Sequence, residues 1–354
     1  MKTTQKSAHI ASIAVATPPY LANQAKADRF LTKHYSKKLS SKSQKIMHNI
    51  LAHPSITQRS FALDDPECLV NENPDKRIAR FTHWAIELSS RAIIKAIKQE
   101  NLSISDISGL VVNTCTGYIC PGISTYLIEK LGLSPQVRAF DLVGSGCGGA
   151  VPNLQMAESI LKESEGLVVS VAVEICSCTF QMDDDLSLIV SNALFADGAA
   201  AAVLWNKPKG FELIASSNYY ATEHREDIRY NHKNGQLHNQ ISVKLPQLVN
   251  KAVAQVVRNL LKQQFLRIKD IDHWALHTGG DKIINSIKDE IGIEESKLRP
   301  TRNVLLKHGN MSSPTVWFVM QDILSNGVKN GDLCIMVAFG AGLSAHAFLF
   351  KKNG

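Results

Sequence analysis

Three residues in the sequence could together transfer an acyl group. Cys147 lies in the run GSGCGG, His277 begins HTGG, and Asn310 lies in GNMSS. A thiolate is a strong nucleophile, and a nearby imidazole or helix N-terminus lowers the pKa of a cysteine. Histidine and asparagine side chains can stabilise a developing oxyanion. The set predicts acyl transfer through a cysteine thioester, followed by carbanion chemistry.

Each of these residues also has a simpler structural interpretation. A cysteine before a helix is often a packed, inert thiol, a lone histidine is often a core or surface residue, and GNMSS is typical of a turn with a helix cap. His308, two residues before Asn310, is an alternative base that spacing alone does not exclude. The glycines beside Cys147 mark a tight turn or leave room for a bulky substrate. Only the combination favours a catalytic site.

The chain repeats a pattern at an interval of about 163 residues, which indicates two related units. ISDISGLVVNTCTG (104–117) resembles IKDIDHWALHTGG (268–280), and GCGGAVPNLQMAESIL (146–161) resembles GNMSSPTVWFVMQDIL (309–324). EGLVVSVAVE and GAAAAVLW in the first unit have counterparts in GDLCIMVAFG and GLSAHAFLF in the second. In each unit a short apolar strand leads through a glycine-rich turn to a helix.

Strands that alternate with helices predict a layered α/β fold. We place the join of the two units near WNKPKG, which gives an N-terminal half of residues 1–208 and a C-terminal half of residues 209–354. The interval places Asn310 at the position that Cys147 occupies in the first half. If a pseudo-twofold axis relates the halves, these two residues face each other at helix N-termini. His277, at the end of a predicted strand, then converges on them.

Bulk composition indicates an ordinary globular protein. Of the 354 residues, 44% are hydrophobic and 20% are charged. No apolar run approaches the roughly 18 residues that span a bilayer. The N-terminus lacks the apolar core of a signal peptide, and an odd count of seven cysteines favours reduced thiols. We therefore expect a cytoplasmic protein without stable membrane insertion.

Charge and metal-ligand patterns exclude other classes of function. The net charge of +7 is modest, and no basic helix interleaved with aromatic residues indicates nucleic-acid binding. A solvated surface or an anionic small ligand accounts for the basic residues instead. No CxxC pair or cluster of histidine and cysteine predicts a metal site. The run Asp183, Asp184 and Asp185 cannot converge on one ion, so it predicts a loop or a helix start.

The same segments resemble the three catalytic signatures of chalcone and stilbene synthases, the type III polyketide synthases. The resemblance lies in GCGGAVPNL around Cys147, HTGG at His277 and GNMSSPTV at Asn310, with further similarity in FADGAAAAVL and FGAGL. GNMSS together with HTGG favours this family over the ketoacyl synthase that starts fatty-acid synthesis. The resemblance covers nearly the whole chain. It implies a thiolase-like αβαβα fold built from two duplicated halves, as a homodimer.

The resemblance also implies a role for each residue. Cys147 would accept a starter acyl group from an acyl-CoA. His277 would hold Cys147 as a thiolate and, with Asn310, polarise the carbonyl of a malonyl thioester. Malonyl-CoA would then lose carbon dioxide, and the resulting enolate would attack the bound acyl group in a Claisen condensation. Neither a metal nor a redox cofactor is implied, because CoA thioesters are the substrates.

Residues around the implied substrate cavity depart from the plant pattern. Phe195 resembles one of two gatekeeper phenylalanines, whereas the second is missing from the stretch HNQ (238–240). Cys120 stands where a plant methionine reaches into the partner's cavity, and Cys176 replaces a cavity threonine. The full set assigned to substrate binding is Phe195, Cys115, Cys120, Cys176, Thr179, Ser312 and Gly342. The cysteines could instead be core packing.

These departures shape the expected substrate. The smaller side chains suggest a roomier or redirected tunnel, and CTGY and FQMDDD resemble bacterial members that act on fatty acyl starters. Asn49, His53 and Lys45 lie near the positions of CoA-binding basic residues in the plant enzymes. We predict an alkylpyrone or alkylresorcinol-like product. The alternatives are a ketoacyl synthase that condenses once onto an acyl carrier protein, and a non-catalytic acyl-binding protein.

Overall fold

The structure is a computed structural model that describes residues 7–233 and 235–354. One nine-stranded sheet runs through it in the order β11-β12-β13-β8-β1-β7-β6-β4-β5. β1 and β8 join the two parts of this sheet through only two residue pairs, His9 with Glu212 and Ile10 with Phe211. The sheet therefore consists of two parts that meet at a short seam.

The two parts have the same topology. The first contains β1 (His9–Ala16), β7 (Asp197–Trp205), β6 (Leu167–Ile175), β4 (Ile107–Asn113) and β5 (Arg138–Leu142). The second contains β8 (Gly210–Tyr220), β13 (Ser344–Asn353), β12 (Leu333–Gly340) and β11 (His273–Leu276). In both, two antiparallel pairings are followed by a parallel one. The predicted duplication is confirmed, with β5 as an extra edge strand in the first half.

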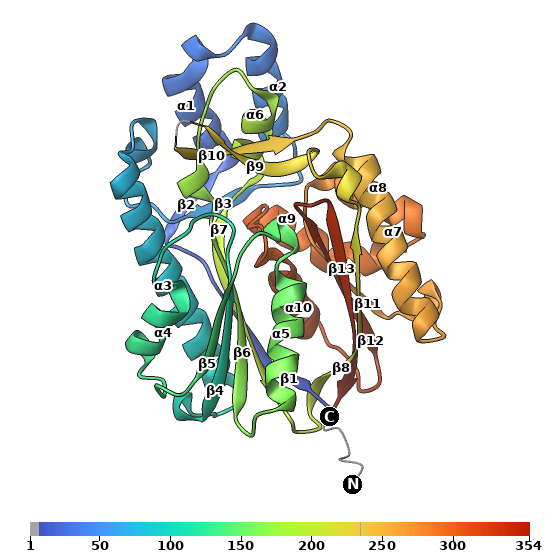
Figure 1. Ribbon diagram of the computed structural model, residues 1–354. Coiled ribbons are helices and arrows are strands. Elements are labelled where there is room, and N and C mark those ends of the chain that lie inside the picture. The colour runs from blue at the N-terminus through green and yellow to red at the C-terminus, as the bar shows by residue number, and fades with distance from the viewer. Residues whose placement is uncertain (1–6, 234) are drawn as a thin grey trace.

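Helices form three further layers (Figure 1). α5 (Ala150–Lys162) and α10 (Thr315–Ser325) lie between the two parts of the sheet, in one hydrophobic cluster with both. α3 (Pro74–Gln99) and α4 (Ile123–Leu131) pack on the outer face of the first half. α7 (Leu245–Gln263) and α8 (Asp281–Ile291) pack on the outer face of the second. The order of layers is αβαβα, as predicted.

The inner helices are apolar because they are covered on most sides. In α10 every residue from 315 to 320 is buried, and α5 buries seven of its thirteen residues. A helix that is apolar around most of its circumference belongs in the interior of a protein. The helix predicted after the glycine-rich turn of the first unit is confirmed by α5. This inner layer joins the two halves.

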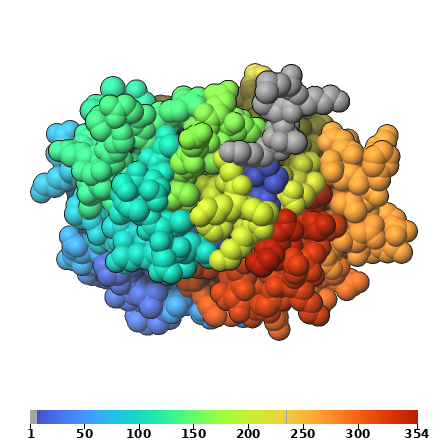
Figure 2. All heavy atoms as spheres, turned by 90° about the horizontal axis from the view of Figure 1, so that it is seen from below, coloured from blue at the N-terminus to red at the C-terminus, as the bar shows by residue number. Residues whose placement is uncertain are grey.

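Smaller elements gather at one end of the sheet (Figure 1). They are β2 (Tyr20–Asn23), α1 (Gln24–Tyr35), α2 (Ser41–Leu51), β3 (Gln58–Phe61), η2 (Pro66–Val70), η5 (Cys176–Thr179), α6 (Leu186–Leu194), β9 (Ile228–Lys233), β10 (Gln236–Ile241) and α9 (Arg299–His308). Figure 2 looks onto the opposite end, where the first half, in blue to green, meets the second, in yellow to red.

The division expected between residues 208 and 209 lies in the turn from β7 to β8. That division stays a proposal.

No helix within the described residues is long and apolar enough to cross a membrane.

Candidate active site

The site lies where the parallel strands of both halves end. His277 follows β11 directly, and Cys147 lies in a 3-10 turn, η4 (Gly146–Gly148), just before α5. The loop after β4 and the turn η5 after β6 also leave the sheet at the carboxyl ends of parallel strands. Because carboxyl ends of parallel strands share one edge of a sheet, residues distant in sequence meet there.

Asn310 lies in a different setting from the predicted one. It forms an isolated parallel bridge with Phe195, and its N–H donates to the carbonyl of Leu194 at 3.0 Å. α10 begins only at Thr315, so Asn310 is not at a helix N-terminus. The prediction that two helix N-termini present Cys147 and Asn310 is therefore wrong for Asn310. The bridge to the first half fixes the position of its backbone instead.

Ser312 connects Cys147 with Asn310. Its hydroxyl lies 3.2 Å from Cys147 Sγ, and its N–H donates to Asn310 Oδ1 at 2.8 Å. Cys115 Sγ lies 3.6 Å from the same hydroxyl. Ser312 is buried and has a positive φ of 60°. Three predicted residues from the two halves are thus in one chamber around Ser312.

His277 packs against Phe339, close in the chain to a residue that contacts the Cys147 turn. Its ring packs edge-on against Phe339, with centroids 5.0 Å apart, and Phe339 leads into Gly340, which packs on the Cys147 turn. The adjacent Thr278 donates a hydrogen bond to the carbonyl of Gly309 at 3.3 Å. His277 Nδ1 is buried without a hydrogen-bond partner among the described residues. His277 therefore lies between the segments that carry Cys147 and Asn310.

Burial favours the neutral forms of the cysteine and the histidine. Removal from water raises the pKa of Cys147 to about 12, against a lowering effect of the Ser312 hydroxyl and a further rise caused by the Glu174 carboxylate. The same cause lowers the pKa of His277 to about 3. In this geometry the pair is a thiol and an imidazole. Formation of the expected thiolate therefore requires transfer of the thiol proton.

The glycines around Cys147 allow close packing. A Cβ on Gly340 would lie 2.5 Å from the backbone nitrogen of Gly148 and the carbonyl oxygen of Ser145. A Cβ on Gly149 would lie 2.7 Å from Asn113 Nδ2. The interpretation that these glycines leave room for a substrate is thus wrong for Gly149. Gly340 lets the end of β12 pack directly on the turn that holds the thiol.

A buried carboxylate that the sequence analysis missed links the two halves. Glu174, near the end of β6, is fully buried and accepts a hydrogen bond from Ser313 Oγ at 2.6 Å. It also accepts bonds from Thr116 Oγ1 and the N–H of Cys115, both at 2.9 Å. Burial raises the pKa of this carboxyl. A single acidic residue in the apolar run GLVVSVAVE is a signal that could have revealed it, since an isolated buried charge needs partners.

Two cavities border the chamber. The turn cavity, of about 820 Å³, is lined by Cys115, Gly146, Cys178 and Tyr230 among others. The lateral cavity, of about 440 Å³, lies between α1, β3, η5 and α6. Its lining includes Phe195, Cys176 and Thr179, three of the predicted residues, and Asn239 from the stretch without a second gatekeeper.

Tyr230 is a second residue that the sequence analysis missed. It lines the turn cavity, and its phenol lies against Thr179, which lines the lateral cavity. Burial raises its pKa. No local motif marks this tyrosine, because the hairpin of β9 and β10 brings it to the site from a distant part of the chain.

Other predicted residues lie outside the chamber. Cys120 is exposed, and neither cavity is lined by Cys120 or Gly342. The ring of His308, the alternative base, packs edge-on against Phe318 of α10. Asn49, His53 and Lys45 are all exposed along α2 and just after it.

The acidic run forms a helix start. Asp185 accepts a hydrogen bond from the N–H of Ser187 as the N-cap of α6. Asp184 accepts from Ser40. Across residues 7–233 and 235–354, no group of three histidine, cysteine, aspartate or glutamate side chains is placed to hold a metal ion.

The chain is similar to known proteins along nearly its whole length. Residues 15–220 match the family described as FAE1/Type III polyketide synthase-like protein. Residues 212–353 match the C-terminal domain of chalcone and stilbene synthases.

Individual proteins support the same similarity. The chain is 28% identical over 320 residues to 3,5-dihydroxyphenylacetyl-CoA synthase of Streptomyces toyocaensis, which covers 86% of this chain and 82% of that protein. It is 28% identical over 359 residues to the alpha-pyrone synthesis polyketide synthase-like protein Pks18 of Mycobacterium tuberculosis, with 96% and 90% covered. The crystal structure of PKS-I from the brown alga Ectocarpus siliculosus has a TM-score of 0.90 at 26% identity, with 99% and 100% covered.

Proposed function

The chain belongs to the FAE1/type III polyketide synthase-like family and is a malonyl-CoA-dependent acyltransferase, and from this premise we propose that it extends a medium- or long-chain acyl-CoA on Cys147. His277 and Asn310 complete the proposed catalytic set. One observation carries the assignment: the Ser312 hydroxyl lies 3.2 Å from Cys147 Sγ while its N–H binds Asn310 Oδ1. A nucleophile and an oxyanion donor from two duplicated halves are thereby linked through one serine.

In the first proposed step, Cys147 accepts the starter. His277 takes the proton of the Cys147 thiol as the sulfur attacks the thioester carbonyl of the acyl-CoA. The tetrahedral intermediate collapses with loss of the CoA thiolate, which takes the proton from His277 and leaves as the free CoA thiol. Burial keeps the His277 imidazole neutral, so a ring nitrogen is free to accept the proton, although the same burial opposes the charge that the imidazole then carries.

In the second proposed step, malonyl-CoA supplies the carbon nucleophile. Hydrogen bonds from Asn310 and His277 to the thioester carbonyl oxygen stabilise the enolate that forms as carbon dioxide leaves. The enolate carbon attacks the acyl group on Cys147, a carbon–carbon bond forms, and the Cys147 thiolate departs. The product is a β-ketoacyl-CoA two carbons longer. Further rounds and ring closure would release an alkylpyrone or alkylresorcinol-like molecule.

The lateral cavity supports an apolar starter. Its lining includes Phe30, Leu31, Phe61, Leu63, Phe180 and Leu188. Its volume of about 440 Å³ is in the range of small-molecule sites. Phe195, which lines this cavity, is bridged to Asn310, so the cavity adjoins one of the proposed catalytic residues. We assign Cys176 and Thr179 to the wall that an acyl chain would touch, and Cys115 and Ser312 to the chamber itself.

We also propose a homodimer that works in the cytoplasm. Tyr118 and Val143 line the turn cavity and are 75% and 61% exposed, so a second copy would cover apolar surface beside the site. Cys120, which is exposed on the same loop as Tyr118, would then face the partner. All seven cysteines are free thiols, which is typical of a reducing compartment.

The proposal is tested with purified protein, malonyl-CoA and a series of acyl-CoAs from acetyl to stearoyl. We expect release of carbon dioxide and cyclised products, identified by mass spectrometry, with the highest kcat/KM for longer chains. Absence of both products with every starter would refute the function. A β-ketoacyl product formed only on an acyl carrier protein would identify a ketoacyl synthase instead.

Two variants separate the proposed roles. Cys147→Ala should abolish acyl loading, measured as a mass increase of the intact protein, whereas Cys68→Ala, at an exposed thiol, should load normally. Asn310→Ala should still load but lose condensation. Equal loss of both steps in Asn310→Ala would contradict the role assigned to it.

A further inference from the structure

The turn η5 forms a wall between the two cavities. Cys176, Ser177 and Thr179 line the lateral cavity, whereas Cys178 lines the turn cavity. A shift of this four-residue turn would therefore change the shape of both cavities together. A 3-10 turn of this length has few internal hydrogen bonds of its own, so its position depends on the groups around it.

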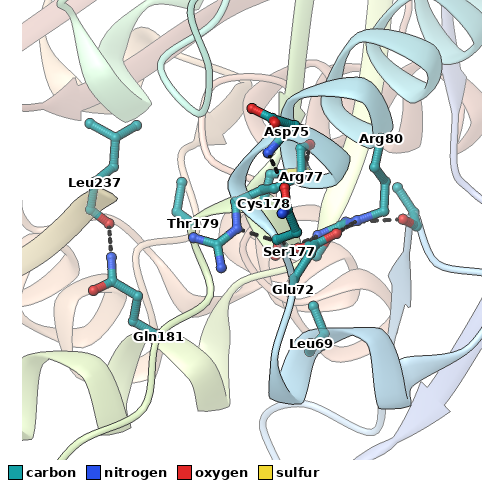
Figure 3. Close-up of polar contacts among 12 residues, drawn as sticks. Leu69, Glu72, Asp75, Arg77, Arg80, Ser177, Cys178, Thr179, Gln181 and Leu237 are labelled. Atoms are coloured by element: carbon teal, nitrogen blue, oxygen red, sulfur yellow. Dashed lines mark hydrogen bonds and ion pairs between the residues drawn. The ribbon is translucent and has the colours of Figure 1, made fainter. Parts of the chain in front are cut away.

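Arg80 on α3 binds this wall through two of its five hydrogen bonds, both to Ser177 (Figure 3). Nη1 donates to Ser177 Oγ at 2.7 Å and to the carbonyl of Ala62 at 3.1 Å. Nη2 donates to the carbonyl of Ser177 at 3.2 Å and to Glu72 Oε2 at 2.8 Å, and Nε donates to Glu72 Oε1 at 2.7 Å. All five N–H groups of the guanidinium can be satisfied in this way.

Asp197 holds the same two residues from the other side. Its carboxylate accepts from the N–H and the hydroxyl of Ser177 at 2.8 and 2.6 Å. It also accepts from the N–H of Ala62 at 2.7 Å. Ser177 and Ala62 therefore each accept a hydrogen bond from Arg80 and donate one to Asp197. Beyond the turn, Gln181 Nε2 donates to the carbonyl of Leu237 on β10 at 2.5 Å (Figure 3).

The clamp, by which we mean Arg80, Glu72 and Asp197 around Ser177, is buried. It touches none of the proposed catalytic residues. The side chains of Arg80 and Glu72 are 11% and 5% exposed, and Asp197 is fully buried. Desolvation of such ion pairs offsets most of their attraction, so apolar residues of similar size often give equal stability. Bidentate arginine pairs, in contrast, fix geometry closely. The arrangement therefore points to a positional role.

We propose that Arg80 is a positioning residue that sets acyl-chain selection by fixing η5 between the two cavities. The proposal rests on the proposed function, in which the growing chain occupies these cavities. Glu72 orients the guanidinium, and Ser177 transmits its position to Cys176, Cys178 and Thr179. Loosening the clamp should alter which chain lengths fit while leaving the chamber around Ser312 in place.

The test compares Arg80→Met with wild type and with Arg258→Met, which breaks an exposed ion pair to Glu290 on the outer helices. We expect the ratio of kcat/KM between long and short acyl-CoAs to change by about tenfold in Arg80→Met, with a shifted product-length distribution. Decarboxylation of malonyl-CoA without a starter should stay near the wild-type rate. Arg258→Met should match wild type in all three measurements.

Glu72→Gln serves as a second variant if Arg80→Met does not fold, as judged by circular dichroism. It should shift the chain-length ratio in the same direction by a smaller factor. An unchanged ratio in the folded variants, or an equal loss of decarboxylation and of condensation with every starter, would overturn the inference. If wild type itself condenses no acyl-CoA, the proposed function fails and not the role of Arg80.

Discussion

The Ser312 hydroxyl contacts the sulfur on which the proposed chemistry depends. Its oxygen lies 3.2 Å from Cys147 Sγ, and it lowers the pKa of that thiol. A hydrogen bond to a developing thiolate stabilises the charge that burial opposes. Ser312 therefore contributes to the proposed loading step, even though its hydroxyl takes no proton.

Ser312→Ala should slow acyl loading by roughly ten- to a hundredfold, since a hydrogen bond to a charged group contributes about 1.5–3 kcal/mol. Single-turnover loading, followed by the mass of the intact protein, measures this rate. Ser325→Ala, at the exposed end of α10, is the control. An unchanged rate in Ser312→Ala would show that its hydroxyl does not assist Cys147.

At the scale of single residues, the sequence predicted those with a local motif. Cys147, His277 and Asn310 lie in short motifs that predict their convergence, and the structure brings two of them, Cys147 and Asn310, to Ser312. Glu174 and Arg80 were missed because their function depends on partners far along the chain. Their partners include Ser313 for Glu174 and Ser177 for Arg80. Only the folded arrangement brings these pairs together.

At the scale of elements, strand β12 supports the turn that carries Cys147. The end of this strand approaches η4 so closely that only a glycine fits at position 340. Strands and inner helices were predictable, because hydrophobic periodicity depends on local sequence. The bridge between Asn310 and Phe195 was not, because an isolated bridge leaves no periodic pattern.

Gly340→Ala should destabilise the protein by about 1–3 kcal/mol, as expected when an extra methyl group meets rigid atoms. The atoms that it would meet are backbone atoms of Ser145 and Gly148, which cannot rotate away. Urea unfolding measures the loss, and acyl loading should fall with it because η4 must move. A variant with wild-type stability would contradict the close packing described here.

At the scale of the whole molecule, buried histidines make stability depend on pH. His346, on β13 beneath the Cys147 turn, is fully buried, and its Nδ1 lies 2.8 Å from Asn218 Oδ1. Burial lowers its pKa to about 4, from 6.5. Between these values the unfolded chain binds a proton that the folded protein does not, so the free energy of unfolding decreases as the pH falls. Above pH 6.5 this histidine has no such effect.

The comparison of wild type with His346→Gln isolates this contribution. Between pH 7 and pH 5 wild type should lose about 2 kcal/mol more than the variant, from a slope of about 1.4 kcal/mol per pH unit below 6.5. Urea midpoints at several pH values measure the difference. His277, Glu174 and Asp197 also titrate abnormally, but they are present in both proteins and their effects cancel. Parallel pH profiles would show that His346 is not protonated on unfolding in this range.

The pairing of two related halves has one more consequence. Positions 147 and 310 are equivalent under the repeat, yet one carries a sulfur and the other an amide. Two cysteines at these positions would lack the amide that stabilises the negative charge in the proposed reaction. Two asparagines would lack the sulfur that attacks the carbonyl. The proposed reaction therefore depends on the difference between two halves of similar architecture.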